Sequence, residues 1–296
     1  MPPGFLVLGS GVAMATLVDP APLGELLRQP FMQRALLGGL LTGSLGGLLG
    51  SFAVLRQLSF FSDALGHSAL LGISLGILLN INPTLVLIPF AVVFALLVNQ
   101  LVERSRLPAD ALLNIVYSSS LALAVVALSL VETYRGGIQQ LLFGDILGIS
   151  WGDLALISGL ALVAVAYLVL SLRAQVLLTL HGDLASAFGV ATRWHRLAFI
   201  VLLALVVAVS IKAVGVLLIS AFVVFPACAS RLVSRSFPLY VLTASLLGGL
   251  CALIGLLASG LTNLPSGPCV VLVQLGGFLV ALLWSQAKAA RGQLQT

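Results

Sequence analysis

The chain has 296 residues, of which 60% are hydrophobic and only 8% are charged, and its mean hydropathy is +1.19. A soluble globular protein is excluded by these values, which are typical of a membrane protein. The formal net charge of +5 does not indicate nucleic-acid binding, because the basic residues fall between long apolar runs, where they set membrane topology. Composition therefore predicts an all-α polytopic membrane protein.

Residues 1–34 form the N-terminal segment that precedes the first clear span. An apolar stretch from Gly4 to Val18 has no basic residue before it and is followed by Pro20, which makes it a poor secretory signal. We expect this segment to be an interfacial element or a short extra span.

Apolar runs of spanning length follow one another through the rest of the chain, and a transmembrane helix needs about 20 such residues. The sixth run is short, so eight or nine transmembrane helices are predicted in one transmembrane domain, residues 35–287. No alternation typical of strands competes with this pattern. The runs are 35–55, 62–82, 84–102, 108–130, 151–172, 197–211, 213–232, 238–259 and 268–286.

The distribution of Lys and Arg predicts the orientation of the spans. If the segment 173–196 is cytoplasmic and the spans alternate, ten basic residues lie on that side and only Arg135 and Lys212 lie on the other. The positive-inside rule then places 173–196 and the tail 288–296 in the cytoplasm. The chain is expected to be a multi-pass protein of the inner (plasma) membrane. Arg28 and Arg34 belong to the ambiguous N-terminal segment.

Glycines form a stripe along the first clear span. Gly39, Gly43 and Gly47 recur at four-residue steps, and Gly46 and Gly50 follow on the neighbouring row. Such a stripe lets a second helix approach closely, so helix packing is the expected use. The alternative is that these glycines thin the wall of a conduit.

Asp63 and His67 stand four residues apart at the start of the second run. On a helix, this spacing puts both side chains on one face, with Cβ atoms roughly 5–6 Å apart. An ionisable group in hydrocarbon is costly, so Asp63 is expected to face protein or a water-filled path. Carboxylate oxygen and imidazole nitrogen suit zinc, manganese or ferrous iron, and the pair is a candidate metal site. The alternative is a hydrogen-bonded pair that locks two helices together.

Asp110 opens another run two spans later, just after Pro108. One full span lies between the two runs, so both helices start from the same membrane side, and Asp110 is a third candidate metal ligand. A carboxylate in the first turn of a helix also suits the helix dipole, which is the competing explanation.

The longest polar segment, residues 173–196, contains His181 and a predicted short helix that ends at Gly189. The helix should expose Asp183 and an apolar ridge of Leu184 and Phe188, a surface that fits a soluble partner. His181 and His195 are expected to be interfacial surface residues.

Four further features carry smaller expectations. Asp145 and Asp153 are expected to cap or solvate helix ends. Lys212 is expected to snorkel at the outer surface or to line the entrance of a pathway. Pro226 is expected to kink or end a helix. Cys228, Cys251 and Cys269 lack CxxC spacing and are expected to act as packing residues.

In their order and spacing, several motifs resemble the ABC-3 family, the permeases of bacterial zinc and manganese importers of the ABC class. The resemblance covers roughly residues 31–285, and Gly66 departs from it by replacing the usual serine. The motifs are residues 31–36, 54–56, 63–65 with His67, 142–144, Asp183 with Ala185 and Gly189, 214–218 with 226–227, and 265–267.

The resemblance implies a vitamin B12 importer-like permease architecture with two copies of this chain in membrane lipid. It also implies a cytoplasmic ATP-binding subunit and an extracytoplasmic metal-binding protein that delivers zinc or manganese. Asp63 and His67 match the metal-path motif, and Asp110 matches an acidic position of many members. Asp183, Leu184, Ala185, Phe188 and Gly189 fall where the permease meets the ATPase.

The expected function is thus ion translocation for an ATP-driven importer, without enzymatic activity or a permanently bound cofactor. The sequence has no GxxxxGK[ST] motif, so ATP should be handled by the partner. A proton- or potential-driven carrier is the alternative, although it would usually place several carboxylates at mid-membrane. An intramembrane enzyme is disfavoured because HExxH, GxSxG and paired central aspartates are missing.

Overall fold

Helices make up all the regular secondary structure of the residues that the computed structural model describes, namely 23–105, 107–130, 144, 146–180 and 182–293. The predicted segment 1–34 therefore lies largely outside the described residues, as do Asp145 and His181. The elements are α1 (Leu23–Arg28), α2 (Pro30–Leu55), α3 (Ser59–Leu78), α4 (Pro83–Arg104), α5 (Ala109–Ser129), the 3-10 turn η1 (Ile146–Gly148), α7 (Trp151–Leu170), α8 (Leu172–Leu180), α9 (Gly182–Ala187), α10 (Thr192–Val214), α11 (Ile219–Val233), α12 (Phe237–Thr262) and α13 (Ser266–Gln293).

Eight of these helices are long and apolar enough to cross a membrane. A ninth, α11, is apolar but has only 15 residues, so it rises by about 22 Å. The prediction of an all-α polytopic protein with eight or nine spans is confirmed. Pro226 lies inside α11 and does not end it.

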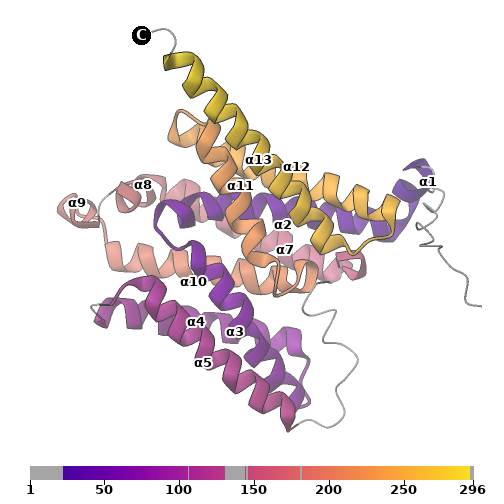
Figure 1. Cartoon of the computed structure of the whole chain (residues 1–296). Coiled ribbons are helices and arrows are strands. Elements are labelled where there is room, and N and C mark those ends of the chain that lie inside the picture. Colours follow the sequence, from indigo (N-terminus) through magenta and orange to yellow (C-terminus); the bar gives the residue numbers. More distant parts are fainter. Residues whose placement is uncertain (1–22, 106, 131–143, 145, 181, 294–296) are drawn as a thin grey trace, which may run out of the picture.

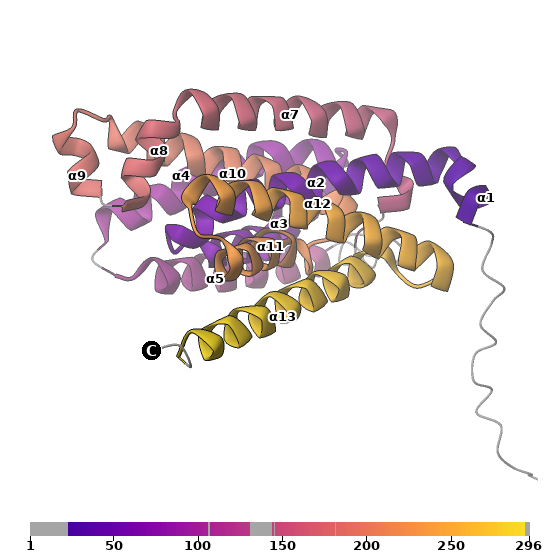
Figure 2. The same cartoon turned by 90° about the horizontal axis from the view of Figure 1, so that it is seen from above.

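Helices α2 and α10 occupy the middle of the bundle (Figure 1). In that view α3, α4 and α5 lie on one side of them, α12 and α13 lie on the other, and α11 crosses in front of α2. Seen from above, α7 and α13 form opposite edges (Figure 2). Phe52, Phe199 and Phe222 are almost completely buried in the core that joins these groups.

The glycine stripe of α2 allows backbone contact with α11 and α12, as expected for helix packing. A Cβ atom on Gly47 would lie 2.1 Å from the carbonyl oxygen of Ala244 in α12. A Cβ atom on Gly50 would lie 2.0 Å from the carbonyl oxygen of Val223 in α11. Real Cβ atoms do not approach backbone this closely, so these positions tolerate only glycine unless the helices move apart.

Replacing Gly47 with alanine is therefore expected to destabilise the fold. Overpacking a tight contact typically costs about 1–3 kcal/mol, which here should appear as a lower midpoint of thermal unfolding in detergent. Gly159→Ala is the matched control, because a Cβ atom on Gly159 of α7 meets nothing within 4 Å. An equal midpoint for the two variants would contradict the packing role of the stripe.

Basic residues gather at one end of the bundle, the end that holds α8 and α9, whereas α1 lies at the opposite end (Figure 2). We call this the basic end. Its described Lys and Arg residues are Arg56, Arg104, Arg173, Arg193, Arg196, Arg231, Arg235 and Lys288.

Candidate functional site

Helix α3 carries the acid and imidazole pair close to the basic end. Asp63 lies in the second turn of α3, and His67 follows one turn later. Their side chains stack as predicted, with Nδ1 of His67 at 3.7 Å from Oδ1 of Asp63. The side chain of Asp63 is 29% exposed and that of His67 is 19% exposed, so both remain accessible in a single chain.

The His67 ring is held in a defined orientation. Its Nδ1 lies 3.0 Å from the backbone oxygen of Asp63. A carbonyl oxygen can only accept, so the neutral ring donates from Nδ1 and keeps the lone pair of Nε2 for a ligand. Tyr117 of α5 packs edge-to-face on the ring, with centroids 5.0 Å apart. A hydrogen bond from one ring nitrogen to a backbone carbonyl is typical of imidazoles that bind metal through the other nitrogen.

Asp63 also faces a groove between α3 and α11. The hydroxyl-bearing residues Ser59 and Ser220 line this groove together with the Asp63 carboxylate. The groove is lined by Ser59, Phe60, Asp63, Ser220, Ala221, Val224 and Phe225.

Gly66 sits between the two residues of the pair, at the point where α3 meets the turn between α10 and α11. A Cβ atom here would lie 2.9 Å from the carbonyl oxygen of Val216 and 3.0 Å from Cγ2 of Ile219. This contact explains why glycine, and not serine, occupies the position in this chain. Close packing at Gly66 also fixes the wall of the groove relative to Asp63.

Asp110 lies in the first turn of α5 and is exposed. Helices α3 and α5 run parallel, because contacts join His67 to Tyr117 and Ser74 to Ala124, both 50 residues apart. This register puts Asp110 level with Phe60, about one turn nearer the basic end than Asp63. Among the described residues, no three His, Cys, Asp or Glu side chains come together to hold one metal ion. Asp110 as a third ligand thus stays a prediction.

The predicted partner-binding segment forms two short helices at the basic end, α8 and α9. Gly189 ends α9 with a φ of 74°, and Val190 donates a hydrogen bond to the carbonyl oxygen of Ala185 at 3.0 Å. The predicted helix end at Gly189 is confirmed. Ala185 is buried, Asp183 is exposed, and Phe188 is 61% exposed, so an aromatic side chain and a carboxylate face outward.

The opposite end of the bundle carries an ion pair between α7 and α10. Nζ of Lys212 lies 2.6 Å from Oδ2 of Asp153. Asp153 also forms a capping box with Ser150 at the start of α7, so its predicted capping role is confirmed. Lys212 neutralises this carboxylate and ties the two helices together.

Sequence reasoning missed a polar network around Arg56, which follows the end of α2. The guanidinium donates to the backbone and side-chain oxygens of Gln175 in α8, and Gln175 donates to the hydroxyl of Tyr167 at 2.7 Å. Tyr167 in turn donates to the backbone oxygen of His195, which is half-buried and not a free surface residue. Burial, aided by the charge of Arg196, lowers the pKa of Arg56 to about 10. The network connects α8 to the α2–α3 junction, three residues before α3.

The architecture is that of a helical membrane protein in which Asp63 faces a groove between α3 and α11, while the His67 ring beside it packs against Tyr117 of α5. The model of the ABC 3 transport family matches residues 28–285. The chain belongs to this family.

Curated relatives agree with this assignment. The chain is 32% identical over 248 residues to the high-affinity zinc uptake system membrane protein ZnuB of Haemophilus influenzae, covering 84% of this chain and 95% of the relative. It is 27% identical to the manganese transport system membrane protein MntC of Listeria monocytogenes, covering 89% and 94%.

A solved structure with a similar fold is PsaBC from Streptococcus pneumoniae in complex with Fab. The TM-score is 0.77 at 25% identity, and the match covers 88% of this chain and 94% of that chain. The resemblance to the ABC-3 family that the sequence motifs carry is thereby confirmed.

Proposed function

We propose that this chain is the membrane permease subunit of an ATP-driven importer of divalent metal ions, with zinc or manganese as cargo. One observation carries the proposal: a member of the ABC 3 transport family has Asp63 in a groove between α3 and α11, with Nδ1 of His67 3.7 Å from the Asp63 carboxylate. The relatives named for zinc and for manganese support a cargo of this kind.

The pair acts as a transient binding site in this proposal. The Asp63 carboxylate and Nε2 of His67 replace part of the hydration shell of the ion as it passes. Two ligands are fewer than the four that a closed zinc site usually provides, so the ion is held weakly enough to leave again. A second copy of this chain closes the open side of the groove and adds further ligands. Asp110 of the same chain is a third candidate ligand beside Asp63 and His67.

ATP is handled by a cytoplasmic partner subunit, and an extracytoplasmic binding protein delivers the metal. The chain itself has no phosphate-binding motif and only two lysines, Lys212 and Lys288. The partner binds at α8 and α9, and closure of the ATP-binding subunits moves these helices. The Arg56 network passes this motion to the start of α3, where Asp63 and His67 lie.

Metal-specific rescue tests this function. Cells deleted for the chain and grown with a chelator should lose growth, and expression of the chain should restore growth at low concentrations of one added metal, zinc or manganese. Rescue that needs neither metal would contradict the proposal. Uptake by the chain alone in proteoliposomes without an ATPase would instead support a proton- or potential-driven carrier.

A further inference from the structure

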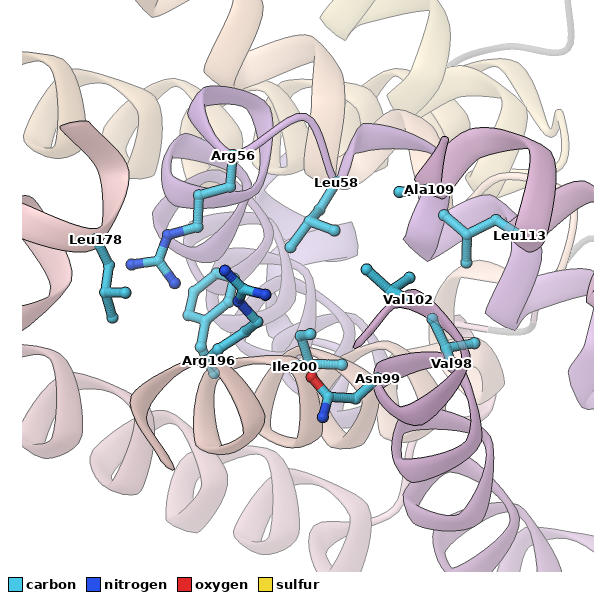
Figure 3. A pocket seen from close by; sticks show the side chains of 11 residues that line it. Arg56, Leu58, Val98, Asn99, Val102, Ala109, Leu113, Leu178, Arg196 and Ile200 are labelled. Atoms are coloured by element: carbon cyan, nitrogen blue, oxygen red, sulfur yellow. The ribbon is translucent and has the colours of Figure 1, made fainter. Parts of the chain in front are cut away.

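A pocket of about 270 Å³ at the basic end shares no lining residue with the groove beside Asp63. It lies where the α2–α3 junction, α4, α5, α8 and α10 converge (Figure 3). Most of its lining is apolar and includes Leu58, Val98 and Leu178. The polar side chains of the pocket are Arg56, Arg196 and Asn99.

The two arginines give the pocket a positive charge that the protein does not balance with an ion pair. Both guanidinium groups extend toward the same space in Figure 3. None of the ion pairs between described residues involves Arg56 or Arg196, and Arg196 forms no hydrogen bond within the described chain. Arg56 is half-buried and Arg196 is exposed beside it, and two positive charges at one site attract an anion.

Asn99 supplies an independent sign of a missing partner. The residue is only 8% exposed, and its Nδ2 donates to Oε1 of Glu103 at 3.3 Å. Its Oδ1 is buried and finds no donor among the described residues. Leaving a buried acceptor unpaired costs about 1–3 kcal/mol, which a hydroxyl group on a ligand would recover.

One carboxylate, Glu103, interacts with the charge of Arg196 but is bonded to a third arginine, Arg193. Oε2 of Glu103 accepts two hydrogen bonds from Arg193, at 3.0 and 3.1 Å, so this acid is already paired with an arginine outside the lining. The charge of Arg56 and Arg196 therefore remains available to a ligand.

We propose that this pocket binds a phosphate group carried on a hydroxyl-bearing, partly apolar body, as in the glycerophosphate headgroup of an acidic phospholipid. The planar guanidinium of Arg196 can donate two parallel hydrogen bonds to phosphate oxygens. The ligand hydroxyl pairs with Oδ1 of Asn99, and the apolar walls take the adjoining alkyl carbons. A soluble glycerol phosphate offers the same headgroup without a tail.

Native mass spectrometry of the purified full-length chain in detergent tests the proposal with three probes. These are dioleoylphosphatidylglycerol, dioleoylphosphatidylcholine and glycerol 1-phosphate. The wild-type chain should retain the anionic lipid in preference to the zwitterionic one, and Arg196→Gln should weaken its retention by about tenfold or more, the size expected for one lost charge-assisted interaction. Ala109→Phe, which fills the pocket without changing charge, should weaken it as well.

Arg231→Gln is the matched control, because it removes the same charge from the basic end outside this pocket and should leave retention unchanged. If glycerol 1-phosphate binds as tightly as the lipid with the same dependence on Arg196, the phosphate site stands and its ligand is soluble. Equal retention of the anionic lipid by wild type, Arg196→Gln and Ala109→Phe overturns the proposal. Equal loss in Arg231→Gln and Arg196→Gln also overturns it, since it would show attraction to the basic end as a whole.

Discussion

Replacing Asp63 with asparagine or His67 with alanine is expected to reduce metal uptake by more than about a hundredfold. Changes to groups that merely support a metal ligand already cost about 10–100-fold, and these two side chains are proposed to contact the ion itself. Asparagine keeps the size of Asp63 but removes its charge. The measurement is uptake of radioactive zinc or manganese by cells in which the variant replaces the native chain.

Two controls separate a lost ligand from a misfolded permease. The amount of each variant in the membrane, measured by immunoblot, should match the wild type. His195→Ala removes another imidazole, one on α10 that contacts Tyr167 of the Arg56 network, so it should lower uptake far less than His67→Ala does. Asp110→Asn should lower uptake by a smaller factor, because Asp110 lies about one turn from the pair. Normal uptake by both Asp63→Asn and His67→Ala would refute their proposed role.

The helical membrane fold follows from composition and apolar run length, whereas the helix bounds do not. Helix α2 begins at Pro30, five residues before the apolar run at position 35, because proline at the first turn starts a helix whatever the hydropathy. Helix α10 begins at Thr192, five residues before the apolar run at position 197. Arginine is a good helix former, so Arg193 and Arg196 continue the helix outside the hydrocarbon layer. Gly215, with a φ of 92°, then ends α10 and shortens the following span.

The stacked pair of Asp63 and His67 was predictable because four-residue spacing is a local property of a helix. Its surroundings depend on contacts between helices, which a single sequence does not specify. Tyr117 reaches His67 from α5, and Ser220 reaches the groove from α11. Arg56 contacts Gln175, a residue 119 positions away, and both are ordinary polar residues at the ends of apolar runs. The sequence marked Arg56 by its charge and by the motif 54–56, but neither signal predicts its contact with Gln175.

Replacing Phe188 with aspartate is expected to release the ATP-binding subunit and to abolish transport. Phe188 follows α9 and is 61% exposed, and beside it Arg173 and Val176 of α8 line a shallow depression. An exposed aromatic side chain next to such a depression is the kind of residue that dominates protein interfaces, where truncation often costs about 2 kcal/mol or more. A buried charge at this contact should cost at least as much, which corresponds to about thirtyfold weaker binding.

Co-purification of the ATP-binding subunit with the tagged permease measures this loss directly. Leu107→Asp is the matched control, because Leu107 is 55% exposed in the link between α4 and α5 at the basic end and lies outside α8 and α9. The Leu107→Asp permease should retain the ATP-binding subunit. The purified Phe188→Asp permease should still bind metal, since Asp63 and His67 are unchanged. A Phe188→Asp permease that retains its ATP-binding subunit and transports normally would show that the contact is made elsewhere, and the assignment of α8 and α9 as the coupling segment would have to be abandoned.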